Sequence, residues 1–397
     1  MFASVLLTGL LAVTPLPAKA ESPLSVVTWG GAYEQSQREA YFAPFTKETG
    51  IEVEVKSYDG SLKEIEAQIG EDPDVVDVST AALKTLCEKE LLDPIDKSIL
   101  EPAQGGVALS AGQNAGDARA ATPASSAAGD FLPGGLSKCG VASVAWSAAV
   151  VFNKDKLKPA PTKLSAFLDL NGFPGRRALP KTARYTLETA LMADGVPPGR
   201  VYNVLATPQG QDRAFAALDK IKSYIAWWTR PSTPLSWVHD GKATMGLAYT
   251  GRIFRSAVEA PDLIGILWDG QIYDLDHWAI PEDAANKDEA RKFIAFATAP
   301  KRLAAQAELT AYGPMRRSAI PLVGNHPMIG TDMRPFLPTA PAHFSNALQF
   351  DELWWEKHGA KLEARFEAWR KDASRKTDAT ADAGQRKKKK RKKKEDR

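Results

Sequence analysis

The first hundred residues combine two hydrophobic periods, which predicts strands and helices in turn. Residues 25–29 form an apolar run typical of a buried strand, and 35–50 have helical spacing up to Gly50. Residues 51–55 alternate apolar and polar side chains with a period of two, as a strand does. A helix at 61–70, a strand at 73–80 and a helix at 81–92 are expected next. This order favours a parallel α/β sheet.

A second α/β series is expected further along the chain. The predicted elements are a strand ending at Asn153, helices at 186–196 and 211–228, a strand-like segment at 243–252, which the segments 264–270 and 272–281 follow, and a long helix at 287–309. Between the two series, residues 103–130 are rich in Ala, Gly and Ser and show no apolar period. We interpret them as a surface insertion.

The amino terminus has the features of an export signal. Residues 1–20 form an apolar run that ends in Ala18-Lys19-Ala20, a small-x-small cleavage pattern, so we predict a removed signal peptide. A retained membrane anchor is the alternative, although the run is short for one. No cysteine follows the cleavage point, which argues against a lipoprotein. A soluble exported protein is therefore expected.

The carboxyl terminus is strongly basic. Residues 386–397 carry ten basic and two acidic side chains, and because the whole chain has a net charge of +3, the rest of it carries −5. Such a block repels itself, so we expect 373–397 to be a solvated, disordered tail that is dispensable for ligand binding. The rest of the chain has no basic stripe or nucleic-acid motif, so no specific nucleic acid is expected as a partner.

Residues with catalytic or metal-binding potential are not spaced as such sites require. The five histidines never fall three or four positions apart, and the sequence has no GxSxG elbow or P-loop. We therefore expect no metal, no cofactor and no catalytic reaction. Cys87 and Cys139 are an even number in an exported chain, which favours one disulfide, with two isolated buried thiols as the alternative.

Aromatic and acidic residues do gather where predicted strands end. Trp29 and Tyr33 flank a double glycine, Tyr249 precedes Thr250-Gly251, and a two-residue period puts Asp274, Asp276 and Trp278 on one face of a strand. Ligands of open α/β sheets lie outside the carboxyl ends of the strands. Carboxylates beside aromatic faces suit an organic cation, at roughly 0.5–2 kcal/mol per ring. Core aromatics with solvated acids are the alternative interpretation.

Several segments, in this order, resemble a known family. They are VTWGGAY at 27–33, FTKETGIEVEV at 45–55, DVVDVST at 74–80, LCEKELLDPID at 86–96, KCGVASVAWS at 138–147, DGKATMGLAYTGR at 240–252, YDLDHWAIP at 273–281 and AYGPMRR at 311–317. Over residues 24–370 the chain resembles the periplasmic solute-binding proteins of bacterial ABC importers, in the spermidine/putrescine-binding branch. The resemblance implies the type II periplasmic-binding fold, with two discontinuous α/β lobes that are joined by crossover strands and close on a ligand.

The resemblance also implies a division of the chain and a set of site residues. Lobe 1 is expected at 21–145 and 271–318, and lobe 2 at 146–270 and 319–372. The implied ligand-binding residues are Trp29, Tyr33, Ser79, Tyr249, Asp274, Asp276 and Trp278. Asp276 matches the acid that receives an amine, and Trp29 and Tyr33 form the lobe 1 wall. Cys87 and Cys139 fall on segments that the family packs together, which implies their disulfide.

Three positions depart from the polyamine-binding pattern. Thr182 and Tyr185 stand where a second pair of acids is expected, and Asp274 replaces a tryptophan. We therefore expect a ligand with one well-recognised cationic end, or a short diamine, over a long triamine.

The sequence thus predicts a periplasmic, monomeric binding protein that delivers a small organic cation, such as a polyamine, to an ABC permease. Two alternatives stay open. The same fold can bind an anion or a ferric ion, although the adjacent tyrosines common in ferric sites are missing. An exported enzyme could use Asp274 and Asp276 as an acid–base pair.

Overall fold

The computed structural model describes residues 22–102 and 127–371. Ten strands in this part form one sheet in the order β2-β1-β3-β8-β4-β7-β5-β6, with β10 beside β8 and β9 beside β4. The strands are β1 Leu24–Thr28, β2 Val53–Ser57, β3 Val75–Ser79, β4 Gly140–Asn153, β5 Arg177–Pro180, β6 Ile225–Trp228, β7 Met245–Tyr249, β8 Ile264–Ala279, β9 Gly313–Pro314 and β10 Leu348–Gln349.

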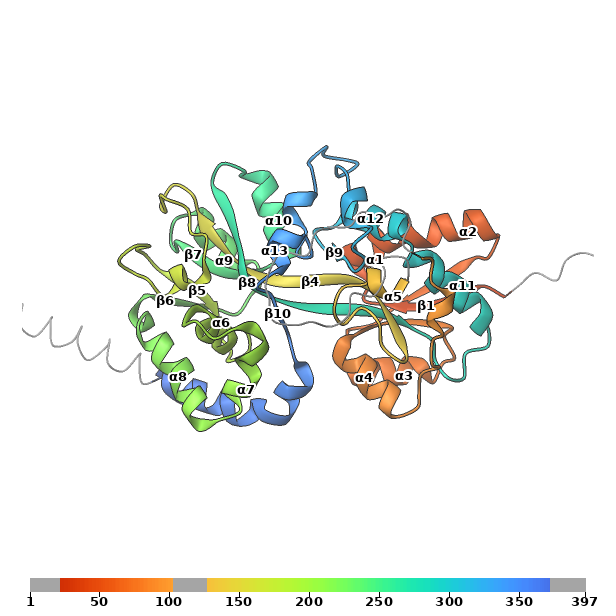
Figure 1. Ribbon diagram of the computed structural model, residues 1–397, viewed down its shortest axis with the longest axis horizontal. Coiled ribbons are helices and arrows are strands. Elements are labelled where there is room, and N and C mark those ends of the chain that lie inside the picture. Colours follow the sequence, from red (N-terminus) through yellow and green to blue (C-terminus); the bar gives the residue numbers. More distant parts are fainter. Residues whose placement is uncertain (1–21, 103–126, 372–397) are drawn as a thin grey trace, which may run out of the picture.

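Helices cover the sheet on both sides (Figure 1). The α-helices are α1 Gly31–Gln37, α2 Ala43–Thr49, α3 Leu62–Ile69, α4 Thr80–Glu88, α5 Ala127–Asp130, α6 Thr186–Ala193, α7 Val201–Leu205, α8 Pro208–Asp219, α9 Thr233–His239, α10 Thr250–Glu259, α11 Lys287–Ala297, α12 Pro300–Leu309, α13 Pro341–Phe344 and a last helix over 352–371. A π-helical turn, η1 Arg38–Phe42, joins α1 to α2. Short 3-10 turns are η2 Lys97–Ile99, η3 Leu164–Phe167, η4 Pro198–Arg200, η5 Lys222–Tyr224, η6 Ile320–Leu322 and η7 Arg334–Phe336.

Two long antiparallel strands, β4 and β8, connect the two halves of the molecule (Figure 1). Their register runs from Gly140 opposite Ala279 to Asn153 opposite Ile264, with shifts between Ala142 and Val144 and between Ala148 and Val150. One end of β8 pairs with β3, and the other end of β4 pairs with β7. This arrangement confirms the two-lobe α/β fold that the sequence predicts.

Each half has its own apolar core. We call lobe 1 the half whose core draws on residues 24–145 and 273–319, and lobe 2 the half whose core draws on 148–272 and 348–366. The core of lobe 1 contains Phe45, Trp278 and Phe293, and that of lobe 2 contains Phe167, Trp355 and Phe366, all fully buried. The limits of the lobes along the chain stay a prediction.

Two predicted helices differ from those observed. The helix expected over 211–228 ends at Asp219, and Ile225–Trp228 form β6 beside β5. These four residues are β-branched, aromatic or small, and three of them are buried, so pairing with β5 outweighs the helical spacing. The helix expected over 287–309 is divided before Pro300, which lacks an N–H and begins α12 instead. As predicted, α2 ends at Gly50, which has a positive φ of 79°.

The predicted disulfide between Cys87 and Cys139 is confirmed. Cys87 lies on α4 and Cys139 immediately precedes β4, with 5.9 Å between their Cα atoms. Both side chains pack in the core of lobe 1. The bond therefore fastens α4 to the strand that leads toward lobe 2.

The predicted signal peptide 1–20 and tail 373–397 lie outside the described residues, as does most of the predicted insertion. Its last four residues form α5, where Ala127 and Asp130 are buried, in contrast to the surface position expected for them. Asp130 is fixed by the guanidinium of Arg316, with 2.6 Å between Nε and Oδ2. Within the described ranges, no helix is both long and apolar enough to cross a bilayer.

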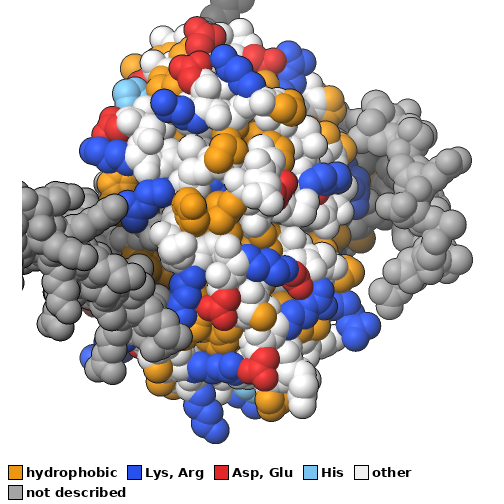
Figure 2. All heavy atoms as spheres, turned by 90° about the vertical axis from the view of Figure 1, so that its left-hand side faces the viewer, with side chains coloured by type: hydrophobic (Ala, Val, Ile, Leu, Met, Phe, Trp, Pro, Cys, Tyr) orange, Lys and Arg blue, Asp and Glu red, His pale blue; other side chains and the backbone are white. Residues whose placement is uncertain are grey.

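The outer end of lobe 2 carries basic and acidic side chains side by side (Figure 2). Examples are the ion pairs of Arg213 and Lys220 with Asp194 and of Arg365 with Asp212. On this face the two signs are therefore interspersed.

Candidate functional site

The turn after β1 places two aromatic side chains at the carboxyl end of the sheet. Gly30 and Gly31 both have positive φ, of 76° and 62°, a region that costs a side-chain-bearing residue strain. This allows the chain to reverse at once from β1 into α1, whose first turn carries Tyr33. Trp29 stays at the turn itself and packs on Tyr58, with 5.3 Å between ring centroids. The sequence therefore needs both glycines to present Trp29 and Tyr33 together.

Asp276 is the central acid of the candidate site. It lies on β8 opposite Ser79, the last residue of β3, and is only 5 % exposed. Its Oδ1 atom is buried and has no hydrogen-bond partner among the described residues. Burial raises its pKa, the carboxyls of Asp77 and Asp274 raise it further, and the nearby indole of Trp146 opposes the rise. A buried acceptor without a partner is unusual and indicates a place for a ligand donor.

Tyr312 connects the two lobes beside this acid. Its ring meets the ring of Tyr33 edge to face, with 5.7 Å between centroids. A methyl group at Gly251, the second residue of α10 in lobe 2, would touch Tyr312 at 3.5 Å. Burial, followed by the charge of Asp276, raises the pKa of Tyr312 to about 12, while the charge of Arg252 opposes the rise. The carboxylate and the guanidinium therefore approach the same phenol from opposite lobes.

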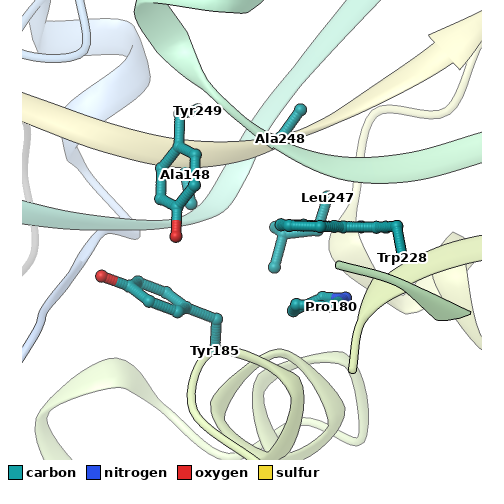
Figure 3. Close-up of a pocket in the computed structure, with 7 residues that line it drawn as sticks. All are labelled: Ala148, Pro180, Tyr185, Trp228, Leu247, Ala248 and Tyr249. Atoms are coloured by element: carbon teal, nitrogen blue, oxygen red, sulfur yellow. The ribbon is translucent and has the colours of Figure 1, made fainter. Parts of the chain in front are cut away.

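Tyr249 lies on the lobe 2 side of the site. It ends β7, pairs with Ala148 of β4, and its ring contacts Trp146 at 6.0 Å and Tyr185 at 5.9 Å between centroids. Tyr249 enters a small, mainly apolar pocket from β7, and Tyr185 enters it from the segment before α6 (Figure 3). The lining residues are Ala148, Pro180, Tyr185, Trp228, Leu247, Ala248 and Tyr249. Strands β5, β6 and β7 all end here, as expected for a ligand face.

Thr182 and Tyr185, which replace the expected acids, have other partners. The Thr182 hydroxyl donates to Glu363 of the last helix at 2.7 Å. Tyr185 stacks on Phe350 with 4.6 Å between ring centroids and has a positive φ of 64°. Neither residue brings a charge to this end of the site.

The remaining predicted site residues differ in their surroundings. Asp274 is 4 % exposed and lies opposite Trp146, and its Oδ1 accepts a hydrogen bond from the Leu275 amide at 2.8 Å. Burial raises its pKa to about 7. The hydroxyl of Ser79 accepts a hydrogen bond from the Ala82 amide and caps α4, so this side chain already has a partner within the protein.

Trp278 is fully buried in the core of lobe 1, where its ring contacts Tyr41, Phe42 and Phe293. It shares a strand face with Asp276, as predicted, but it lies opposite Asp77, deeper in the sheet and under the helices. Because helices cover both faces of the sheet, the two-residue period does not distinguish a covered position from an open one. We therefore leave Trp278 out of the candidate site.

Four further residues of the candidate site were not predicted from the sequence, namely Asp77, Trp146, Arg252 and Tyr312. Each belongs to one of the segments that carry the family resemblance, and two of them, Asp77 and Arg252, lie within three residues of a predicted site residue. Asp77 occupies a strand that is otherwise apolar, and a charged residue at such a position was the available signal. Trp146 and Tyr312 offered no comparable signal.

Comparison with known proteins decides the family. Residues 40–330 match the family described as bacterial extracellular solute-binding protein. The chain belongs to this family. Over 373 residues, or 93 % of this chain and 96 % of the relative, it is 36 % identical to the gamma-aminobutyric acid-binding protein of Pseudomonas aeruginosa.

Solved structures agree with this assignment. The Atu4243-GABA receptor is 26 % identical over 88 % of this chain and 98 % of its own, with a TM-score of 0.65. The protein AgtB of Agrobacterium tumefaciens, in complex with agropinic acid, is also 26 % identical, covers 88 % of this chain and 98 % of its own, and has a TM-score of 0.57. PotD of Streptococcus pneumoniae, a spermidine/putrescine-binding protein, shares the fold at 18 % identity, 88 % and 100 % coverage and a TM-score of 0.66.

The chain is thus a solute-binding protein of the ABC-transporter type, and the polyamine branch is one of several groups that it resembles. In the part of the chain that the structure covers, no group of His, Cys, Asp and Glu side chains is arranged to hold a metal ion.

Proposed function

We propose that this protein captures a small molecule with a primary ammonium group between its lobes and delivers it to an ABC permease. A short ω-amino acid such as 4-aminobutyrate (GABA) is the first candidate. The observation that carries the proposal is the buried, unpartnered Oδ1 of Asp276, surrounded by the aromatic side chains of both lobes. We further propose a periplasmic location, a monomeric state and no catalytic reaction.

The amine end of the ligand is assigned to Asp276. A desolvated carboxylate attracts a cation more strongly than an exposed one does, but it is costly when left unpaired. Trp29, Tyr33 and Tyr249 provide aromatic faces on either side, and each adds cation–π attraction of roughly 0.5–2 kcal/mol. A cation that fills this space therefore gains from both effects.

The carboxylate end is assigned to Arg252. This residue lies in the first turn of α10, is exposed, and forms no ion pair within the described residues. The charge of Arg252 lowers the pKa of Tyr312 and that of Asp276 raises it, so the cationic and the anionic group are both near this phenol. A guanidinium is suited to two-point binding of a carboxylate.

An amino acid fits this pair of charges better than a polyamine does. A polyamine has no group for Arg252, and Thr182 and Tyr185 provide no acid for a distant amine. The 36 % identity to a GABA-binding protein supports the same choice. Asp274 would be the acid for the second amine of a short diamine, which makes putrescine the appropriate competitor to test.

Calorimetry with a ligand panel tests the proposal. The panel contains GABA, 5-aminovalerate, butyrate, putrescine, spermidine and ferric citrate, with NMR of the recovered ligand as a check for turnover. We expect tight binding of GABA or 5-aminovalerate, no binding of butyrate, and a loss of at least tenfold in Arg252→Gln. Tight binding of putrescine without GABA, binding of the ferric complex alone, or conversion of the ligand would contradict the proposal.

A further inference from the structure

We propose that Asp77 is a second ligand-binding carboxylate, which shares the ammonium group with Asp276, and that ligand capture displaces a proton from this pair. The inference rests on the proposed function and concerns the recognition of the amine end. It makes the site selective for a primary ammonium over a methylated one, and it makes affinity depend on pH.

The register of the sheet brings the two acids together. Asp77 lies on β3 opposite Trp278, and Asp276 lies on β8 opposite Ser79. The two acids are therefore diagonal neighbours on one face of an antiparallel pair, where such residues lie about 7–8 Å apart, with less between their Cβ atoms. Asp77 is fully buried and Asp276 is 5 % exposed.

One half of the Asp77 carboxyl is held by the protein and the other half is not. Oδ2 accepts from Gln37 Nε2 at 2.6 Å and from Thr28 Oγ1 at 3.1 Å. Oδ1 is buried and has no hydrogen-bond partner in the described part of the chain. Trp29 and Tyr33 lie close enough to stabilise the ionised form, although neither reaches hydrogen-bond geometry. The unpaired Oδ1 of Asp77 therefore lies beside Trp29 and Tyr33, the aromatic residues on the lobe 1 side of the site.

Three buried acceptors are thus unpaired within one region, namely Asp77 Oδ1, Asp276 Oδ1 and Tyr33 Oη. Both acids act electrostatically on Tyr33, which places its hydroxyl near each of them. A primary ammonium donates three hydrogen bonds, and a quaternary ammonium donates none. The three acceptors match the three donors of a primary ammonium. A trimethylammonium group would leave all three acceptors without a partner and without water, which costs free energy.

Two enclosed carboxyls resist simultaneous ionisation, because neither has water around it and each repels the other. Burial raises the pKa of Asp77 to about 7, and burial followed by the charge of Asp77 raises that of Asp276. The other titratable or charged groups facing the pair are Tyr33, Tyr41, Tyr58, Tyr312 and Asp274, with Arg252 acting on Tyr312 and Lys84 and Glu352 acting on Asp274. Among the described residues, none of the main influences on the pKa of Asp77 or Asp276 comes from a cationic side chain.

These contacts determine whether ligand affinity rises or falls with pH. The free protein holds a proton on the pair near neutral pH, and a bound ammonium favours the doubly ionised pair, so binding releases the proton. Lowering the pH stabilises the protonated, empty site and weakens binding. With one proton released, Kd should rise about tenfold per pH unit below pH 7.

The test is calorimetry of GABA binding at pH 8.0, 7.0 and 6.0, each in two buffers that differ in ionisation enthalpy. For the wild type we expect release of about one proton per ligand at pH 6.0, the tenfold slope, and binding of 4-(trimethylammonio)butanoate at least 100-fold weaker than that of GABA. Asp77→Asn keeps an acceptor for Gln37 and Thr28, so it should fold. It should bind GABA at least tenfold more weakly at pH 8.0, with a flat pH profile and less than half the proton release.

Glu188→Gln is the matched control, because Glu188 is a buried acid in lobe 2 outside the candidate site, and it should leave proton release on ligand binding unchanged. Should Asp77→Asn fail to fold, Asp77→Glu replaces it and should keep proton release while losing at least tenfold in affinity. If the wild type binds none of the amines, the proposed function fails. If the wild type binds GABA but releases no proton, or Asp77→Asn retains its affinity, slope and proton count, the inference about Asp77 alone fails.

Discussion

Replacing Asp276 by Asn removes the charge that the proposed ligand needs, while it keeps the size of the side chain. Deleting one partner of a desolvated charge pair costs about 3–5 kcal/mol. Asp276 is 5 % exposed, so the upper part of this range would apply to a carboxylate that is ionised in the free protein. Its pKa is raised by burial and by Asp77, so part of the ionisation must accompany binding. We therefore expect a loss of about 3 kcal/mol at pH 7, or about 150-fold in Kd.

Calorimetry with the best ligand of the panel measures this loss. Asp262→Asn serves as the control, because it removes the same charge from an exposed position in lobe 2 and should change Kd less than twofold. The melting temperature of Asp276→Asn should equal or exceed that of the wild type, since the amide replaces a buried carboxyl whose Oδ1 has no hydrogen-bond partner among the described residues. An affinity within threefold of the wild type would refute the assignment of Asp276 as the counter-charge.

Three further predictions test other parts of the structure. Burial raises the pKa of Glu188 from 4.5 to about 7, so the stability that its protonated form contributes is complete below pH 4.5 and is lost as the pH rises through 7. Between pH 5 and pH 8, the free energy of unfolding in urea should therefore fall by up to about 3 kcal/mol less in Glu188→Gln than in the wild type. An equal fall in both proteins would contradict this. Replacing Cys87 and Cys139 by Ala should lower the free energy of unfolding by about 4 kcal/mol in the chain-entropy account, and a change below 1 kcal/mol would argue against it. Trp278→Ala should lower the free energy of unfolding in urea by about 3–5 kcal/mol, because Trp278 is fully buried. Trp29→Ala should mainly weaken ligand binding, which calorimetry measures. The reverse pattern would show that Trp278 belongs to the site.

The fold was largely predictable because its elements carry strong local signals. Period-two and helical spacings located β1, β2, β3 and α4 within a few residues, and Gly50 ended α2 as expected. The failures occurred where tertiary contacts outweigh local pattern. In the sequence, Ile225–Trp228 continue the helical spacing of the preceding residues. In the structure they pair with β5, because their side chains complete the core of lobe 2.

The candidate site was less predictable, because it depends on which residues meet across the sheet. Asp276 and Tyr33 were identifiable from their place at predicted strand ends. Asp77 was not selected, because its proximity to Asp276, which is 199 positions further along the chain, depends on the register between β3 and β8. Tyr312 was missed for the same reason, since only the folded chain places it between Tyr33 and Gly251.

Each lobe is built from an early and a late segment of the chain, and this determines when each lobe can fold. The core of lobe 1 includes Met315 and Ala319, and that of lobe 2 includes Trp355 and Phe366, so a chain that emerges amino terminus first completes neither core until its last quarter. Pairs such as Tyr41 and Gln306, which are 265 positions apart, form only then, and such distant contacts slow folding. Such late completion of both cores suits the proposed periplasmic location, because an exported chain has to cross a membrane before it folds.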